Sequence, residues 1–193
     1  MAKAEKINKL LNRDYPVFEA LRCVGHLSED QLLNDLGIAR NRIERYVATG
    51  WVKKDIHNTT DGERIVSYTP TRKGFELMRE KLEYRDIYKP QSVEHDVELA
   101  KCYFSLSQEE RKSWITETQQ QRELKELYND LRMEDPQQAQ EYRDYSACDG
   151  GYINEEGEVC LIEIVTSTYT KAMIDSKHSS AGLYGANYSE WRV

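Results

Sequence analysis

Two carboxylates near the end of the chain stand out as candidates for chemistry. Glu163 lies within Val-Cys-Leu-Ile-Glu-Ile-Val (residues 159–165), a run that is otherwise apolar on both faces. Asp149 precedes a Gly-Gly pair on the neighbouring strand-like segment. A carboxylate in a central strand is costly to bury unless it is paired, protonated or bound to a cation. We therefore treat Asp149 and Glu163 as a candidate catalytic pair and as a candidate Mg²⁺ site.

This layout resembles the core of the PD-(D/E)XK nucleases, where two acids on adjacent buried strands follow a helix. The resemblance implies that the carboxylates bind Mg²⁺ and that a lysine two residues after the second acid helps to activate water. Val165 holds that position here, and Lys171 could swing in from the following helix. Glu94 or Glu98 on the preceding helix could add a third carboxylate. Three hypotheses stay open: an active nuclease, a nuclease-like fold used for binding, and an unrelated α/β domain.

The first half of the chain carries a second group of residues, suited to contact with DNA. On a helical wheel, Asn41 and Arg45 project away from the apolar face of Ile43 and Val47. An arginine can bond guanine, and an asparagine adenine, in bidentate fashion, while nearby cations meet phosphates. The candidate DNA-binding residues are Arg40, Asn41, Arg42, Arg45, Thr49, Lys53, Lys54 and Arg64. The alternatives are a solvated helix face with ordinary charges and a protein-docking module.

Local sequence signals predict the elements that would position these residues. The predicted helices span residues 15–25, 28–36, 39–49 and 72–83, and strands 51–56 and 64–68 form a hairpin around Asp61-Gly62. Ser28 and Gln31 form a capping-box pattern, and Gly37 and Gly50 end their helices. Thr71 would cap the last helix. Helices followed at once by a β-hairpin are typical of a winged helix-turn-helix, which we assign to residues 1–83.

The second half is predicted to be an α/β domain over residues 92–193, after a linker at 84–91. The expected elements are a helix at 93–106 capped by Ser92, a strand at 114–118 and a hairpin of strands 146–153 and 158–165. A polar helical insertion at 119–143, interrupted at Asp135-Pro136, forms either a protruding helical hairpin or a surface helix packed by one side. For His95, a structural hydrogen bond linking the helix to the hairpin is favoured over metal ligation. Residues 166–193 are expected to be too short for a full closing strand and helix.

Charge and cysteine usage restrict the partners. Residues 1–80 hold 14 Lys+Arg and 12 Asp+Glu, so residues 81–193 hold 27−14 = 13 and 34−12 = 22 respectively, a balance of −9. DNA contact is therefore expected from the first half. The four cysteines form no C-x-x-C pair and are predicted to be buried free thiols in a reducing compartment. We find neither a signal peptide nor a membrane span, and expect a cytoplasmic protein of a bacterial or phage-infected cell.

Several fragments, taken in order, resemble the replication-relaxation family of plasmid and conjugative-element proteins. The fragments are residues 47–52 (Val-Ala-Thr-Gly-Trp-Val), 68–74 (Tyr-Thr-Pro-Thr-Arg-Lys-Gly), 94–100 (Glu-His-Asp-Val-Glu-Leu-Ala), 114–117, 148–150 and 161–165. The resemblance implies an N-terminal winged helix coupled to a restriction-endonuclease-like domain. It also implies a role in plasmid replication, mobilisation or their control through DNA near an origin.

We therefore expect an α+β protein that binds double-stranded DNA sequence-specifically, as a homodimer. Its expected role is that of an accessory or regulatory factor of a plasmid or phage, in replication, mobilisation or transcription control. Its second domain is expected to be a degenerate or minimal, non-catalytic PD-(D/E)XK-like core without a cofactor. One alternative is a Mg²⁺-dependent nuclease using Asp149, Glu163 and Lys171. Another is a phage-type factor that binds a host enzyme through its acidic half.

Overall fold

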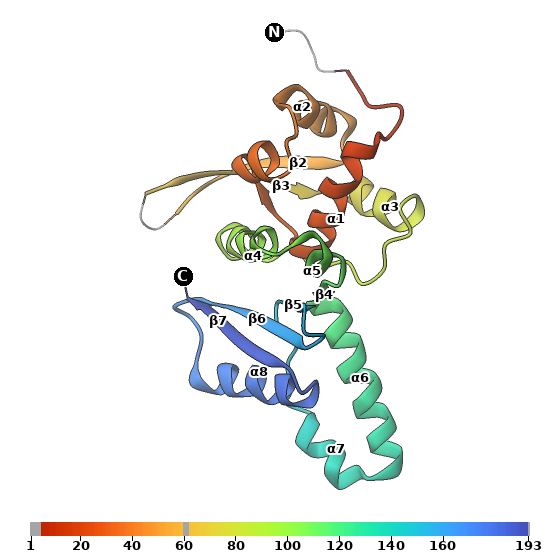
Figure 1. Cartoon of the computed structure of the whole chain (residues 1–193), viewed down its shortest axis with the longest axis vertical. Helices are drawn as coiled ribbons and strands as arrows, with labels where there is room; N and C mark the ends of the chain where they lie inside the picture. Colours follow the sequence, from red (N-terminus) through yellow and green to blue (C-terminus); the bar gives the residue numbers. More distant parts are fainter. Residues whose placement is uncertain (1–4, 60–61, 193) are drawn as a thin grey trace. The chain divides into compact units, whose positions relative to one another are not determined.

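The computed structural model describes residues 5–59 and 62–192, with no description of the Glu141 side chain. The chain is a mixed α+β protein that divides into two compact units, Met1–Ser105 and Leu106–Val193. Each unit has its own sheet, of three and four strands respectively (Figure 1). The two units are described separately below.

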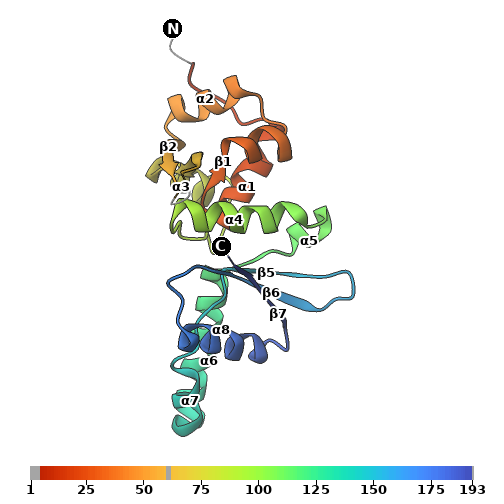
Figure 2. The same ribbon diagram turned by 90° about the vertical axis from the view of Figure 1, so that its left-hand side faces the viewer.

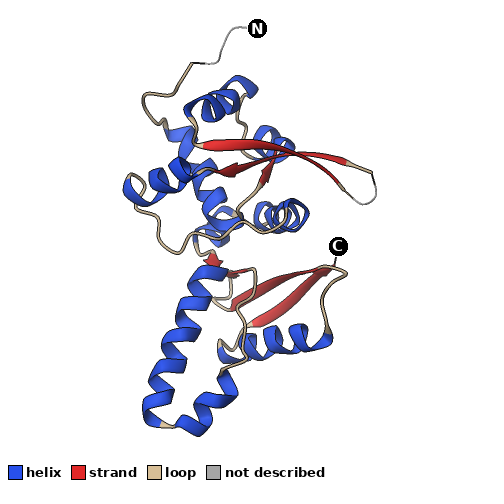
Figure 3. Cartoon of the chain, turned by 180° about the vertical axis from the view of Figure 1, so that it is seen from behind, coloured by secondary structure: helices blue, strands red, loops and turns tan. Residues whose placement is uncertain are grey.

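The sheet of the first unit has the strand order β1-β3-β2 and is antiparallel throughout. Its strands are β1 (Leu27–Ser28), β2 (Val52–Asn58) and β3 (Arg64–Pro70). The predicted hairpin is confirmed, with Ile56 opposite Val66 and both strands extending beyond the expected ends. The expected turn includes residues 60 and 61, which lie outside the described residues. Figure 3 shows β2 and β3 as the long paired strands of this unit.

The helices of the first unit follow their capping signals. They are η1 (Asn12–Asp14), α1 (Tyr15–Val24), η2 (Gln31–Asp35), α2 (Arg40–Thr49) and α3 (Arg72–Glu80). The capping box is confirmed, since the Gln31 amide N–H donates to Ser28 Oγ at 3.1 Å and the Ser28 N–H to Gln31 Oε1 at 2.8 Å. Residues 31–35 are wound as a π-helical turn instead of an α-helix. Gly50 ends α2 in the left-handed conformation (φ 78°), as expected.

Helix α4 (Val93–Ser105) belongs to the first unit, which differs from the expected boundary. It packs on α1, β1 and β3, and it buries Leu99, Ala100 and Tyr103. The expected linker at 84–91 is itself anchored, because Tyr88 is fully buried and its N–H donates to Arg22 O at 2.9 Å. The first unit therefore ends near residue 105, where the apolar face of α4 is exhausted.

The second unit is built on a sheet of order β4-β5-β6-β7. The strands are β4 (Ile115–Thr116), β5 (Gly150–Ile153), β6 (Val159–Val165) and β7 (Asn187–Arg192). β4, β5 and β6 pair antiparallel, and β7 pairs parallel to β6. The parallel pair is joined by α8 (Lys171–Leu183), which lies along the sheet in both Figure 1 and Figure 2. The expectation that residues 166–193 are too short for a closing helix and strand was therefore wrong.

The polar insertion forms a helical hairpin. A short helix α5 (Gln108–Lys112) precedes β4, and the insertion consists of α6 (Glu117–Glu134) and α7 (Pro136–Tyr142). The predicted interruption is confirmed, because Asp135 Oδ1 accepts from the N–H groups of Gln137 (3.0 Å) and Gln138 (3.1 Å) and starts α7. α6 packs against α7, so the hairpin interpretation holds.

Candidate functional site

Asp149 and Glu163 lie together in the second unit, as the sequence predicted. The β5–β6 register pairs Gly150 with Ile162 and so brings Asp149 opposite Glu163. The Asp149 N–H donates to Glu163 Oε2 at 3.1 Å, and the Ile164 N–H donates to Asp149 Oδ2 at 2.8 Å. Both side chains are essentially inaccessible, with 1% and 0% exposure. The two acids thus form a buried, hydrogen-bonded pair at the start of β5.

The lysine that joins this pair is Lys177, and the predicted Lys171 is not part of it. Lys171 is exposed at the first turn of α8. Lys177 lies on the buried face of α8, and its Nζ is 3.0 Å from Glu163 Oε1. It also donates to Ala147 O. Helical spacing could have revealed it, because Lys177 shares one side of α8 with the buried Ser180 and Ala181.

A tyrosine completes the environment of Glu163. The Tyr169 hydroxyl donates to Glu163 Oε1 at 2.7 Å. Sequence analysis did not single out Tyr169, which precedes α8; Thr170 caps that helix by accepting from Met173 N at 3.3 Å. We name the group Asp149, Glu163, Tyr169 and Lys177 the carboxylate–lysine cluster.

Burial controls the protonation of this cluster. Burial and the neighbouring Asp149 raise the pKa of Glu163 to about 7, although Lys177 and Tyr169 favour its ionised form. Burial alone would lower the pKa of Lys177, but the charges of Glu163 and Asp149 raise it above its ordinary value. Lys177 is therefore a cation near neutral pH, while Glu163 can exchange a proton there. Such a carboxylate can take part in general acid–base chemistry.

The fit of Mg²⁺ to these residues is partial. Mg²⁺ is commonly bound by one or two carboxylates together with waters, which Asp149 and Glu163 could supply. Glu163 Oε1 is already in contact with Lys177 and Tyr169, so a metal ion bound at that oxygen would have to displace one of them, whereas Oε2 accepts only from the Asp149 N–H. Within the described ranges, no group of three or more His, Cys, Asp or Glu side chains is arranged for metal binding. The expected third carboxylates have partners in the first unit, Glu94 with His57 and Glu98 with Lys101.

In the first unit, the structure removes Arg42 and Thr49 from the predicted DNA-binding set. Arg42 is 6% exposed, with its Nε 2.9 Å from Asp14 Oδ1 and its Nη2 paired with Asp14 Oδ2. Thr49 is also 6% exposed, and its hydroxyl donates to Arg45 O at 2.7 Å. The predicted orientation of α2 about its own axis was wrong. The helix buries Arg42, whereas Val47, which was expected to face inward, is 36% exposed.

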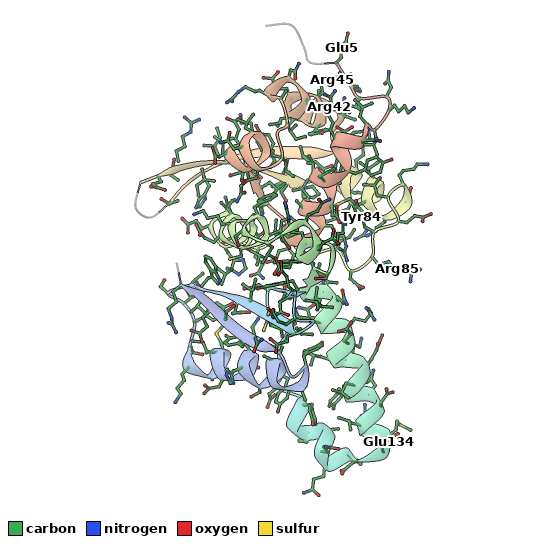
Figure 4. The ribbon with its side chains drawn as sticks, in the orientation of Figure 1. Glu5, Arg42, Arg45, Tyr84, Arg85 and Glu134 are labelled. Carbon is green, nitrogen blue, oxygen red and sulfur yellow. The ribbon has the colours of Figure 1, made fainter. Side chains whose placement is uncertain are left out.

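Arg45 is turned toward the N-terminal segment of the same unit. Its Nε donates to Glu5 O at 3.2 Å, and its Nη2 lies 3.5 Å from Lys6 O. Figure 4 shows Arg45 beside Glu5, with Arg42 directed into the unit. The N–H of Ile7 continues this contact by donating to Thr49 Oγ1 at 2.7 Å. Arg45 is therefore engaged with the protein itself.

The remaining predicted DNA-binding residues are exposed. They are Arg40, Asn41, Lys53, Lys54 and Arg64. Glu29 lies between two of them, 2.6 Å from Arg40 Nη1 and 3.3 Å from Lys54 Nζ. Lys53 pairs with Asp55 at 2.8 Å. Exposed pairs of this kind are weak, so these cations remain available to an anionic partner.

The one histidine singled out from sequence, His95, belongs to a buried network that sequence analysis did not anticipate. Its Nδ1 lies 3.0 Å from Asp96 Oδ1, within its own helix. Asp96 also accepts from Tyr88 Oη at 3.1 Å and lies 2.7 Å from His26 Nδ1. The expected link from helix to hairpin is made instead by His57 and Glu94, at 3.1 Å. His95 thus has a structural hydrogen bond, but to a different partner.

All four cysteines are free thiols, as predicted; the expected burial holds for Cys23, Cys102 and Cys148, but Cys160 is only partly buried. No helix within the described ranges is both long and apolar enough to cross a bilayer. Comparison with protein-family models, with curated proteins and with solved structures found no match. The functional argument therefore depends on the residues themselves.

Proposed function

We propose that the first unit binds double-stranded DNA through α2 and the β2–β3 hairpin. The observation that supports the proposal is the order α1–β1–η2–α2–β2–β3, which is typical of a winged helix-turn-helix, together with exposed cations on α2 and on the β2–β3 hairpin. In such domains the helix before the hairpin enters the major groove. The wider role that we infer, from the sequence resemblance, is accessory or regulatory action in replication, mobilisation or transcription of a plasmid or phage, as a homodimer.

The roles of the exposed residues follow from their chemistry. Asn41 and Arg40 lie in the first turn of α2, and recognition helices contact base edges mainly with their N-terminal residues. Lys53, Lys54 and Arg64 on the hairpin would contact phosphates, which supply affinity without sequence preference. Arg42, Arg45 and Thr49 are left out of this interface because each is bound within the protein.

A duplex-binding titration at several salt concentrations tests this proposal. The double variant Lys53→Ala/Arg64→Ala removes two phosphate contacts and should lower the slope of log affinity against log salt by about 2. The matched control is Arg79→Ala, because Arg79 is an exposed arginine in the last turn of α3, nine residues after the end of β3. Equal affinities and equal slopes for the wild type and the double variant would remove this interface.

A second candidate function, hydrolysis of nucleic acid by the second unit, is favoured by the contact between Lys177 and Glu163. The second unit has three antiparallel strands, then a helix and a fourth strand that is parallel to the third. This order is similar to that of the restriction-endonuclease-like core. The lysine missing at position 165 has a substitute on α8. Asp149 and Glu163 would hold Mg²⁺, which would act as a Lewis acid toward a phosphodiester. Lys177 would place its positive charge beside the anionic centre, and Tyr169 would orient Glu163.

Incubation of supercoiled plasmid with the protein and Mg²⁺ or Mn²⁺ tests this candidate. Nicking that is lost in Glu163→Gln and in Lys177→Ala, but kept in Lys171→Ala, would support it. Lys171→Ala is the matched control because Lys171 is on the same helix and exposed. Absence of nicking by the wild-type protein with both metals would eliminate hydrolysis and leave the second unit as a binding domain.

A further inference from the structure

The second unit contains a pocket of about 390 Å³ whose wall includes Lys177 of the carboxylate–lysine cluster. One wall is a single side of α6, formed by Glu117, Gln121, Leu124, Lys125 and Tyr128 at helical spacing. The opposite wall comes from residues 142–147. A volume of this size lies in the usual range for small-molecule sites, about 300–1,000 Å³.

Three tyrosines give the pocket flat aromatic surfaces. Tyr142 and Tyr145 are in edge contact, with ring centroids 5.2 Å apart and an interplanar angle of 64°. Tyr128 lines the pocket from α6. All three rings are half-buried, so each presents part of its surface to a ligand. Aromatic faces of this kind stack on nucleobases with little dependence on which base is present.

The charged residues that line the pocket are mainly basic, Lys125, Arg143 and Lys177 with one acid, Glu117, whereas the surroundings are acidic. Residues 106–193 hold nine Lys+Arg and 17 Asp+Glu, a balance of −8. Lys125 and Arg143 nevertheless both line the pocket and are exposed. Neither has an ion-pair partner in the part of the chain that the structure describes. Two unpaired cations beside aromatic rings favour a ligand that is both planar and anionic.

The wall opposite α6 is held in place by side chains of α8 and α6. Ser176 Oγ donates to Asp144 O at 2.5 Å, and Lys177 donates to Ala147 O. Gln120 of α6 exchanges two hydrogen bonds with the Cys148 backbone, at 3.2 and 3.0 Å. The pocket is thus formed before any ligand binds, which lowers the entropic cost of binding.

We propose that this pocket binds a nucleotide, with the base against Tyr142, Tyr145 and Tyr128 and the phosphate between Lys125 and Arg143. The ligand is either a free mononucleotide or the terminal nucleotide of a nucleic-acid strand. The proposal goes beyond duplex binding by the first unit, and it does not require hydrolysis at the carboxylate–lysine cluster. A strand held here would have its backbone beside Lys177, which lines the same pocket.

Calorimetric titration of the full chain, without divalent metal, tests the proposal. The probes are dAMP, deoxyribose 5-phosphate and inorganic phosphate. We expect dAMP to bind at least about fivefold more tightly than the sugar phosphate, because stacking of the base on an aromatic side chain adds to the affinity. A 5′-phosphorylated trinucleotide that binds more tightly than dAMP identifies a strand end, and one that binds equally or more weakly identifies a free nucleotide.

Matched variants locate the site. Arg143→Gln and Tyr142→Ala should each weaken dAMP binding about fivefold or more, and Tyr142→Phe should retain it because the ring is kept. Arg132→Gln is the control, as Arg132 is an exposed arginine of α6 that does not line the pocket. Equal affinity for dAMP and the sugar phosphate, no binding at millimolar dAMP, or no effect of Arg143→Gln would each overturn the proposal. Since duplex binding is measured separately with hairpin variants, the two proposals can fail independently.

Discussion

Lys177 on α8 and Glu163 on β6 form a buried ion pair with an Nζ–Oε1 distance of 3.0 Å. They are brought together because α8 connects the parallel strands β6 and β7 and lies along the sheet. The lysine thus reaches the carboxylate from a helix, although position 165 on the strand itself holds valine. Lys177 belongs to the carboxylate–lysine cluster and also lines the tyrosine-lined pocket, so it is common to both sites.

The raised pKa of Glu163 predicts a specific pH dependence of stability. Its pKa rises from 4.5 to about 7 on folding, chiefly through burial. The stability that depends on protonated Glu163 is therefore present below about pH 4.5 and is lost as the pH rises through about 7. Glu163→Gln lacks this titration. Relative to wild type, the variant should gain free energy of unfolding between pH 5 and pH 8, measured by urea denaturation. A difference between the two proteins that does not vary with pH would contradict this assignment.

The buried pair of Arg42 and Asp14 should be a major contributor to the stability of the first unit. Arg42→Ala leaves a carboxylate that is 0% exposed without its counter-charge, although Tyr46 still donates to it at 2.6 Å. Breaking such a pair costs about 3–5 kcal/mol. The control Arg40→Ala removes an exposed cation and should cost about 1 kcal/mol or less. Equal losses in chemical denaturation would show that Arg42 is not the buried anchor.

The same pair predicts sensitivity to acid. Burial opposes ionisation of Asp14, but hydrogen bonds from Arg42 and Tyr46 hold its pKa below the usual 3.8. Its contribution to stability is therefore present above about pH 4 and is lost as the pH falls through the lowered value. Wild type should lose stability more steeply than Asp14→Asn in thermal melts below pH 4. Parallel curves for the two proteins would contradict this expectation.

Arg45 is expected to secure the N-terminal segment and to contribute little to duplex binding. Its guanidinium donates to the backbone of Glu5 and Lys6, next to the bonded amide of Ile7. Arg45→Ala should therefore speed hydrogen exchange of the Ile7 amide several-fold. It should leave DNA affinity closer to wild type than Lys53→Ala/Arg64→Ala does. A loss of affinity as large as that of the hairpin variant would return Arg45 to the DNA interface.

Close packing requires glycine at positions 74 and 150 but not at position 182. A Cβ at Gly74 would lie 2.1 Å from Trp51 O, and one at Gly150 would lie 2.2 Å from Trp114 Cζ2. Gly74→Ala and Gly150→Ala should each destabilise their unit by about 1–3 kcal/mol or more. Gly182 on α8 has open space around it, so Gly182→Ala should stabilise the helix by about 0.5–1 kcal/mol. Thermal unfolding of the three variants checks the order.

Sequence reasoning succeeded where the signal is local. The Ser28–Gln31 capping box, the stop at Gly50, the cap at Thr71 and the break at Asp135-Pro136 each depend on residues within a few positions of one another. The continuous apolar run at 159–165 predicted β6 and therefore the burial of Glu163, and the expected pairing of adjacent strands brought Asp149 next to it. These features follow from backbone geometry and spacing alone.

The errors concern orientation and distant contacts. Arg42 is buried because it pairs with Asp14, which lies 28 residues earlier in the chain, and Val47 is exposed instead. The boundary between the two units lies near residue 105, later than predicted, because α4 packs on α1 and β1. The sequence by itself determined most of the helices and strands of the first unit and the burial of Asp149 and Glu163. Only the tertiary structure decided which face of α2 is exposed and which lysine meets Glu163, because each depends on contacts between residues far apart in the chain.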